Sequence, residues 1–545
     1  MFETRPEGPP PVEVERRRRA VVVGAALTSL AFLAMCVARM CPDLALIGDS
    51  AELVTAAALW GVPHPPGYPL YTAIGHLFAA VPLGALPWRV HVTSAVFHAG
   101  AVAATIAAAF ALTKSRAAAI AAGIGLGLSR SFLFGSLYAE VFPLNDLLYA
   151  LTIALALVAR RAPREARGRV LHALALSAGV AAGHHMMFAL AAPAVAVLAW
   201  RPTASLVRER PRTGMTLAVA FLAPVALAYV LVPLAAGRSP YLSWGDVHDW
   251  SSFARLVTRA DYGGLFSPSS HATSEHGWIR VAAWARLVAR SMGLLMFFGA
   301  LLGVVVCLHR DRAAGIGLLL AVALPGPVFA WLNALDTSNE GTLAYFERFT
   351  TMSHIALAVA FGAAVSAARS AIGRRPGAVA VLAVVLFAWA SARFVSASDV
   401  DMHADRRGID FAHDLLLRVP DRSLVLLSGD EPIDAELYLC GVERLCGDRI
   451  AFAPGMLSLP WKMAEIRRRH PDLDIPWTEG PALRRTHQLV AATHDRPVYV
   501  YPDLLEKDPL LASFETVPEG LLLRAAARRA DLPADDQGGL RSMSR

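Results

Sequence analysis

RRRRAVVVGAALTSLAFLAMCVARM, residues 16–40, sets four consecutive arginines directly before a long apolar run. The run from residue 20 to residue 40 is long enough to cross the hydrocarbon core of a bilayer as a helix. It lacks a convincing small-residue cleavage site and is longer than the apolar part of a secretion signal. Because arginine clusters stay on the cytoplasmic side of membranes, the segment predicts a first transmembrane helix with a cytoplasmic N-terminus.

The composition of the whole chain points the same way. Of 545 residues, 55% are hydrophobic and 17% are charged, whereas soluble domains carry about a quarter of charged residues. The net charge of +7 comes from short arginine clusters between apolar runs and not from a face with interleaved aromatic residues, so it does not indicate a nucleic-acid partner. We therefore expect the lipid bilayer to surround most of the chain.

Ten more apolar runs follow, which predicts about eleven transmembrane helices. With the N-terminus inside, every arginine-rich short turn falls on the cytoplasmic side. An odd number of crossings places the C-terminal third outside, with the loops 41–90, 237–290 and 334–352. The two runs beside His184 and His185 have a second interpretation, as one kinked helix. The ten runs are residues 91–112, 117–134, 137–159, 170–184, 186–200, 215–236, 291–308, 314–333, 353–368 and 377–394.

The C-terminal third differs in composition from the rest. SLVLLSGDEPIDAELYLCG (423–441) and RPVYVYPDLL (496–505) predict strands followed by a helix or loop, and so a small α/β or α+β domain. Cys440 and Cys446 lie in this part and, if it is extracytoplasmic, are either free or joined in a small disulfide loop.

We therefore divide the chain into four parts. They are an arginine-rich cytoplasmic tail (1–19), a helical membrane core (20–394) whose first outer loop is 41–90, an extracytoplasmic domain (395–530) and a disordered tail (531–545).

Two carboxylates open the segment LIGDSAELVTAAALWGVPHPPGYPLYTAIGHLFAAVPLG (46–84) in the first outer loop. One interpretation is a capping box, in which the Asp49 side chain accepts a hydrogen bond from the Glu52 amide and the Glu52 side chain accepts one from the Asp49 amide. The functional interpretation is a general base or a ligand for a polar substrate. The two are compatible, because a helix N-terminus favours ionised carboxylates.

A rigid turn follows these acids. Four prolines occur among the seven residues from Pro63 to Pro69, around His64 and Tyr68. They either stiffen a connecting loop or present His64 and Tyr68 to a ligand, and their density favours the second interpretation.

Further polar residues lie near the predicted outer ends of helices, where burial in lipid would be costly. Glu140, in YAEVFPLN, is either solvated or functional. His184 and His185 interrupt an apolar stretch, without the spacing of a zinc site. Asp261 and Tyr262 belong to a loop that either covers a substrate or forms an aromatic belt.

Arg348, in YFERF, lies on the predicted outer side, whereas the arginine-rich turns are predicted to be cytoplasmic. It predicts either a phosphate contact or a salt bridge, for example with Glu347. The sequence contains no P-loop, no HExxH and no GxSxG. The glycines at 123, 125 and 127 lack a preceding strand and indicate close helix packing. Any reaction then takes its energy from an activated substrate.

GDSAELVTAAALWGVPHPPGYPLYTAIGHLF, YAEVFPLN, GHHMM, WGDVHDWSSFARLVTRADYGG and YFERF occur in this order. Over about residues 40 to 470 the chain resembles the transmembrane protein 260-like family, which contains an animal protein O-mannosyltransferase and many bacterial proteins of unassigned function. The first motif is the specific one.

The resemblance implies an α-helical polytopic membrane glycosyltransferase of the GT-C type, acting outside a bacterial inner or plasma membrane. Its donor would be a polyprenyl-phosphate sugar, with mannose or another hexose, and its acceptor a hydroxyl on protein, lipid or glycan. Asp49 would be the general base, or Glu52 in its place. Sugar, acceptor or phosphate contacts would come from His64, Tyr68, Glu140, His184, His185, Asp261, Tyr262 and Arg348. The sequence requires no cofactor and leaves metal dependence open.

A transporter or flippase of a lipid-linked or polar solute is the alternative from another class. Many helices and glycine-interrupted segments favour it. The polar residues gather on one side of the membrane, however, whereas alternating access needs them near the midplane. A purely structural subunit is a third interpretation, which the loss of a single carboxylate would leave intact.

Overall fold

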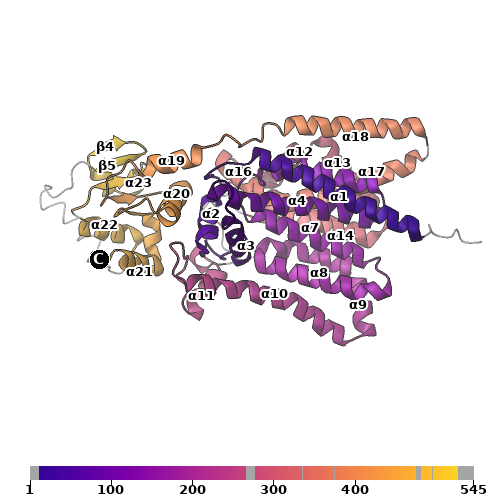
Figure 1. Cartoon of the computed structure of the whole chain (residues 1–545), viewed down its shortest axis with the longest axis horizontal. Helices are drawn as coiled ribbons and strands as arrows, with labels where there is room; N and C mark the ends of the chain where they lie inside the picture. The colour runs from indigo at the N-terminus through magenta and orange to yellow at the C-terminus, as the bar shows by residue number, and fades with distance from the viewer. Residues whose placement is uncertain are drawn as a thin grey trace, which may run out of the picture.

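The computed structural model describes residues 11–264, 276–333, 335–373, 375–473, 475, 480–493 and 495–525. A bundle of long helices occupies most of it, and a smaller domain with a sheet lies against one end of the bundle (Figure 1). We call this end the domain end. The predicted disordered tail, 531–545, lies outside the described residues.

The bundle follows from the apolar runs. Its α-helices are α1 (Pro11–Arg39), α4 (Leu86–Thr113), α5 (Arg116–Gly127), α6 (Arg130–Phe134), α7 (Phe142–Ala159), α8 (Arg164–His184), α9 (Ala192–Glu209), α10 (Arg212–Ala236), α12 (Gly277–Met292), α13 (Leu294–Arg310), α14 (Arg312–Ala323), α15 (Phe329–Leu332), α17 (Thr351–Ile372) and α18 (Pro376–Ser396). Their outward residues, such as Leu222 and Phe387, are apolar and exposed, as a lipid-facing surface requires. The chain is an integral membrane protein.

The number of spans is lower than the eleven expected. Among the described residues, eight helical stretches are long and apolar enough to cross a membrane, and nine if the pair α12 and α13 forms one span bent by 112°. The run 117–134 breaks into the short helices α5 and α6. The run 170–184 belongs to α8, whose first turns carry Glu165, Arg167 and Arg169.

The two runs beside His184 and His185 are separate helical elements. His185 has an extended backbone (φ −144°, ψ 132°) between α8 and the 3-10 turn η1 (Met186–Ala191) that leads into α9. The interpretation as one kinked helix is therefore wrong. Extended backbone here turns both histidine side chains inward, where each is at most 4% exposed.

Small residues let the bundle helices approach closely. A Cβ at Gly123 would come within 2.4 Å of the Ile106 side chain, and a Cβ at Gly303 within 1.8 Å of the Ala360 carbonyl oxygen. The glycine pattern in α5 is thus a packing device, as the sequence predicted.

The long loops of the bundle lie at the domain end. It includes α2 (Ser50–Leu59), α3 (Pro69–Ala79), α11 (Trp250–Val257), the 3-10 turn η2 (Ala260–Tyr262) and α16 (Glu340–Glu347). Pro69 starts α3, where the missing amide costs nothing. The first predicted outer loop is therefore largely helical and faces the C-terminal domain (Figure 1).

The C-terminal domain contains a mixed five-stranded sheet in the order β2-β1-β3-β5-β4. β1 pairs in parallel with β2 and β3, whereas β5 is antiparallel to β3 and β4. Both quoted segments form a strand followed by a helix, as predicted. The elements are α19 (Arg407–Leu416), β1 (Leu424–Leu426), α20 (Asp430–Tyr438), β2 (Ile450–Phe452), α21 (Pro460–Arg469), α22 (Ala482–Ala492), β3 (Val498–Val500), α23 (Leu504–Lys507), β4 (Thr516–Glu519) and β5 (Leu522–Ala525).

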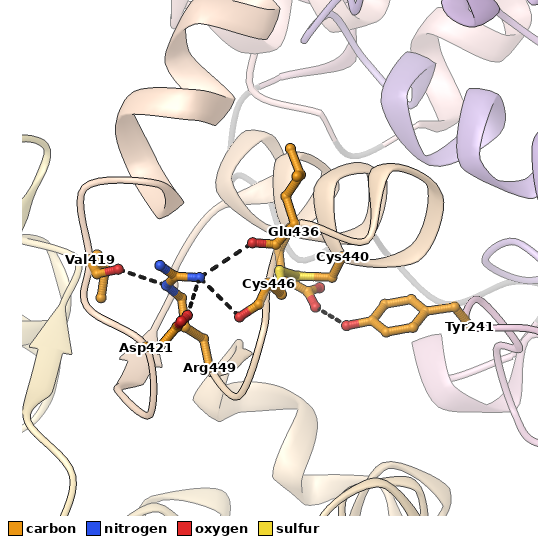
Figure 2. Close-up of a disulfide and its surroundings, with 8 residues drawn as sticks. Tyr241, Val419, Asp421, Glu436, Cys440, Cys446 and Arg449 are labelled. Atoms are coloured by element: carbon orange, nitrogen blue, oxygen red, sulfur yellow. Dashed lines mark hydrogen bonds and ion pairs between the residues drawn. A yellow bond between two sulfur atoms is a disulfide. The ribbon is translucent and has the colours of Figure 1, made fainter.

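Cys440 and Cys446 form a disulfide just after α20. Arg449 closes the same loop by donating to the carbonyls of Val419 (2.7 Å) and Cys446 (3.0 Å) (Figure 2). Tyr241, from the loop after α10, donates to Glu436 of α20. The disulfide loop therefore lies at the contact between the domain and the bundle.

We expect Gly303→Ala to lower the thermal unfolding midpoint in detergent by several degrees, because the added methyl group collides with the backbone of α17 and overpacking costs roughly 1–3 kcal/mol. The matched control is Gly377→Ala in α18, where a Cβ meets nothing within 4 Å. Equal midpoints for the two variants would contradict the close contact of α13 and α17.

Candidate active site

The start of α2 carries the two carboxylates that the sequence singles out. Asp49 occupies the N-cap position, but its side chain accepts no capping hydrogen bond. Glu52 turns toward the proline-rich loop instead of back to Asp49. The capping-box interpretation is therefore wrong, and both side chains are available to other groups.

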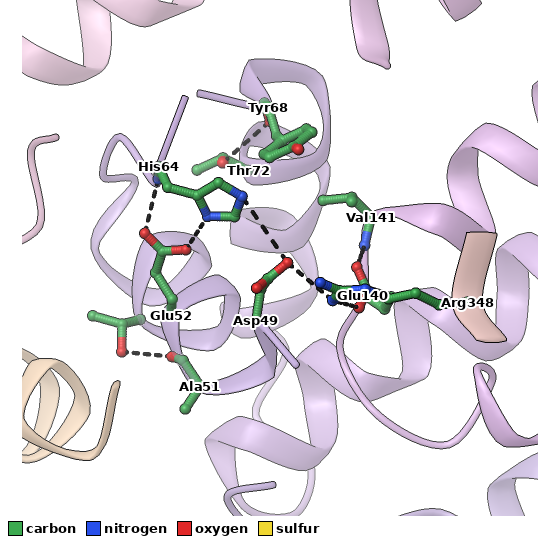
Figure 3. A network of polar contacts seen from close by, with 10 residues as sticks. Asp49, Ala51, Glu52, His64, Tyr68, Thr72, Glu140, Val141 and Arg348 are labelled. Carbon is green, nitrogen blue, oxygen red and sulfur yellow. Dashed lines mark hydrogen bonds and ion pairs between the residues drawn. The ribbon is translucent and has the colours of Figure 1, made fainter. Parts of the chain in front are cut away.

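Glu52 holds the proline-rich loop through His64. The His64 amide donates to Glu52 Oε1 (2.8 Å), and the His64 ring Nδ1 contacts Glu52 Oε2 (Figure 3). The other ring nitrogen, Nε2, lies 4.0 Å from Asp49 Oδ2. His64 thus stands between the two acids, with Glu52 almost fully buried and Asp49 21% exposed.

Arg348 reaches the same carboxylate from the start of the α17 region. Its Nη1 donates to Asp49 Oδ2 (3.1 Å) and to Glu140 Oε2 (2.8 Å) (Figure 3). The guanidinium also lies 3.7 Å from the centre of the Tyr345 ring. Its Nε is buried and has no hydrogen-bond partner among the described residues. The side chain therefore keeps a donor for a further acceptor.

Arg348 does form a salt bridge, the second of the two interpretations, but with Asp49 and Glu140 and not with Glu347. Glu347 contacts the Ser131 hydroxyl instead. Glu140, the partner that Arg348 has, is fixed on both sides, because its amide donates to Ser94 Oγ and its Oε1 accepts from the Val141 amide. Only 1% of the Glu140 side chain is exposed, so the interpretation as a solvated residue is wrong.

Aromatic and imidazole rings line the cluster. Tyr68 lies edge-on to His64 (5.2 Å) and stacks on His185 (5.6 Å). His184 Nε2 donates to the Val141 carbonyl, and its Nδ1 is buried without a hydrogen-bond partner among the residues that the structure describes. These rings join the loop 63–69 to the ends of α7 and α8.

Asp261 and Tyr262 lie farther out. Asp261 pairs with Arg255 (2.6 Å) and accepts from the Trp461 indole (3.3 Å), so it connects η2 to the C-terminal domain. Tyr262 stacks on Trp244. Burial, followed by the charges of Glu52 and Asp49, raises the pKa of Tyr262. Tyr262 is thus within electrostatic reach of the acids, whereas Asp261 has structural partners.

Asp434 of α20 is a site residue that the sequence analysis missed. It is 8% exposed, and α20 packs on α2 through Ala56 and Leu437. Burial and then the charges of Glu52 and Asp49 raise the pKa of Asp434 well above its ordinary range. The acidic start of the predicted helix, GDEPIDAE, was the signal, but nothing in it shows that this helix meets the first loop.

The charges around Asp49 keep it ionised. Burial alone would raise its pKa, but Arg348 and then His64 hold the pKa below its ordinary value. Burial would lower the pKa of His64, whereas Glu52 and Asp49 raise it to about 9. Asp49 is therefore a carboxylate at neutral pH, with a free edge toward solvent and two cations beside it.

The two side chains Asp49 and Arg348 can accept a proton and bind an anion, respectively, at adjacent points. Asp49 offers the acceptor, and Arg348 offers the cation with an unused Nε donor. Among the described residues, no group of three or more His, Cys, Asp or Glu side chains is arranged to hold a metal ion.

Known proteins match the chain over this region. A family model described as the N-terminal domain of the protein O-mannosyl-transferase TMEM260 matches residues 49–206, which include Asp49, Glu52, His64 and Glu140. The mouse (Mus musculus) protein O-mannosyl-transferase TMEM260 is 28% identical over 454 residues, or 79% of this chain. This chain is therefore similar in sequence to TMEM260 proteins. It covers 62% of the length of the mouse relative. The Dictyostelium discoideum protein of the same description is 50% identical over 34 residues, 6% of this chain and 4% of that protein.

A solved structure shares the fold. ArnT from Cupriavidus metallidurans, bound to undecaprenyl phosphate, superposes with a TM-score of 0.57 at 12% sequence identity and covers 94% of this chain and 99% of its own. At this identity the likeness shows the fold alone. The GT-C-like architecture expected from the sequence, a helical membrane core with a C-terminal domain, is confirmed.

The position of His64 between two carboxylates predicts a pH-dependent stability. Since the folded pKa, about 9, exceeds the ordinary value near 6.5, the protonated histidine stabilises the fold fully below about pH 6.5. This contribution declines as the pH rises through 9. We expect the difference in thermal midpoint between wild type and His64→Asn to be largest near pH 6 and smallest near pH 10.

His172→Asn is the matched control for this measurement, because His172 bonds to the Gly168 carbonyl and the Thr216 hydroxyl and forms no ion pair with a carboxylate among the described residues. A wild-type minus His64→Asn difference that grows from pH 6 to pH 10 would contradict the charged state of His64.

Proposed function

We propose that the chain is a membrane glycosyltransferase that moves a hexose, with mannose the first candidate, from a polyprenyl-phosphate donor to a hydroxyl of a protein acceptor. The active site would face the extracytoplasmic side of a bacterial membrane, with the N-terminus in the cytoplasm. The observation that carries the proposal is the contact of one arginine with two carboxylates, Asp49 and Glu140, at the domain end of the bundle.

The relatives support each half of this reaction. The protein acceptor and the mannose come from the description of the TMEM260 relatives. The lipid phosphate comes from ArnT, whose structure contains undecaprenyl phosphate. An arginine with a free donor suits the phosphate of such a lipid, because guanidinium and phosphate oxygens form charge-assisted hydrogen bonds.

In the proposed reaction Asp49 takes the proton of the acceptor hydroxyl while the hydroxyl oxygen attacks the anomeric carbon. The bond from that carbon to the phosphate oxygen breaks, and both its electrons leave with the polyprenyl phosphate. Arg348 stabilises the negative charge that develops on the phosphate. When Arg348 turns toward the phosphate, its pull on Asp49 weakens, so the basicity of Asp49 rises at the moment it is needed.

Glu52 and Glu140 act through other residues. Glu140 holds Arg348 in place from the side opposite to the solvent. Glu52 fixes His64 and the proline-rich turn, which sets the position of Tyr68. We therefore assign the base to Asp49 and treat Glu52 as a positioning residue.

We expect Asp49→Asn to reduce the release of polyprenyl phosphate from labelled polyprenyl-phosphate mannose by about 10²–10⁴-fold, the usual contribution of a general base. Glu52→Gln should cost only about tenfold, since it weakens one charged hydrogen bond. The measurement uses membranes that contain the full chain and an acceptor.

Glu340→Gln is the matched control, because Glu340 is exposed at the start of α16 at the same end of the bundle. A larger loss in Glu52→Gln than in Asp49→Asn would reassign the base. No release by wild type with mannose, glucose or arabinose donors would favour transport instead.

Arg348→Gln should lower kcat/KM for the lipid donor by more than about 100-fold, and Arg348→Lys by roughly tenfold, because lysine restores the charge but not the planar fork. Arg130→Lys serves as the control, since Arg130 is half-exposed and paired with Asp399. Equal losses in the lysine and glutamine variants would show that geometry matters more than charge at this position, and unchanged kinetics would rule out the phosphate contact.

A further inference from the structure

A cavity of about 480 Å³ lies where the loop after α10 meets the C-terminal domain. This volume is within the roughly 300–1,000 Å³ that is typical of ligand-binding pockets. Residues from the end of α2, the loop after α10, the disulfide loop and α21 line it, among them Leu59, Tyr241, Arg444, Trp461, Arg468 and Arg469. The proposed reaction uses none of these side chains.

The cavity and the proposed base lie at opposite ends of the same short helix. Asp49 precedes the first residue of α2, and Leu59 is its last residue. At 1.5 Å per residue, about 15 Å of helix separates them. A ligand that reaches both points must therefore be extended, which excludes a single sugar or a lone ion as a shared ligand.

Aromatic rings connect the two points along the domain contact. Tyr262, whose pKa is raised by burial and then by the charges of Glu52 and Asp49, stacks on Trp244 with centroids 6.1 Å apart. Trp244 in turn contacts Trp461 in the cavity wall, at 5.4 Å. Large rigid rings offer contact area to a bound chain at a low cost in side-chain entropy.

The lining carries excess positive charge. Arg468 pairs with Asp246 (2.8 Å), and Arg469 pairs with Glu465 (2.6 Å) and packs on the Tyr241 ring. These pairs occupy both carboxylates of the lining. Arg444, next to the disulfide, is exposed, and among the described residues its guanidinium has no ion-pair or hydrogen-bond partner. The cavity therefore offers one unused cation.

We propose that this cavity binds a flanking segment of the acceptor polypeptide and pairs Arg444 with a carboxylate side chain of that segment. The inference rests on the proposed function, because it takes the acceptor to be a protein. An extended chain covers about 3.3 Å per residue, so 15 Å corresponds to about four or five residues. The protein then prefers acceptor peptides in which an acidic residue lies four or five residues from the hydroxyl residue that receives the sugar.

The test is peptide binding to the full chain in nanodiscs without any sugar donor. The probes are fluorescein-labelled peptides with one threonine in a neutral background and one aspartate placed two to eight residues away, on either side. We expect the affinity to be highest at a separation of four or five residues. At that separation it should be about tenfold higher than for the same peptide with asparagine in place of aspartate, as one charge-assisted contact provides. Arg444→Ala should remove this preference and Arg444→Lys should retain part of it.

Arg422→Ala is the matched control, because Arg422 is an exposed arginine of the same domain that pairs with Asp495 outside the cavity. A preference that is independent of separation, or that persists in Arg444→Ala, would overturn the inference. Displacement of the acidic peptide by a mannose oligosaccharide at equal affinity would also overturn it and assign the cavity to a glycan. Since binding needs no donor, these results are separate from those of the donor-release assay, which tests the proposed function.

Discussion

The guanidinium of Arg348 joins parts of the chain that are 299 and 208 residues away in sequence, at Asp49 and Glu140. Only 8% of this side chain is exposed. A cation that is removed from water in this way needs paired charges, and the two carboxylates supply them. The contact therefore fixes the start of α2 and the loop before α7 relative to α17. The loops of the domain end are arranged around it.

A buried ion pair of this kind is weak evidence for stability, because the cost of removing three charges from water offsets much of their attraction. The arrangement is consistent with the ligand site of the proposed reaction. Two negative groups already compensate Arg348, yet its Nε has no hydrogen-bond partner in the part of the chain that the structure describes. Asp49, in contrast to Glu140, keeps an edge toward solvent. In the proposed reaction this difference in exposure matches the roles of the two residues, with Asp49 as the base and Glu140 as the residue that positions Arg348.

The C-terminal domain is part of this arrangement and does not merely follow the membrane core. Its helix α20 packs on α2 and brings Asp434 near the acids. Trp461 of α21 reaches the Asp261 side chain. The helix that carries Asp49 thus lies between the bundle and the domain. Both the proposed chemistry and the proposed acceptor cavity depend on that position.

The sequence by itself determined the membrane class, the helical core, the strand-helix units of the C-terminal domain and the acids and arginine worth following. Apolar runs, prolines and misplaced charges are local signals, and burial in lipid makes them costly to place elsewhere. The span count was too high, because a local run such as 117–134 does not show that its helix breaks at residues 128–129.

Only the tertiary structure decided which charges meet. Neither the pairing of Glu52 with His64 nor the choice of Glu140 over Glu347 by Arg348 has a local signature. Such contacts depend on how the helices pack, and packing is set by side chains from distant parts of the chain. For the same reason no sequence signal placed Asp434 or the Arg444 cavity beside the first loop.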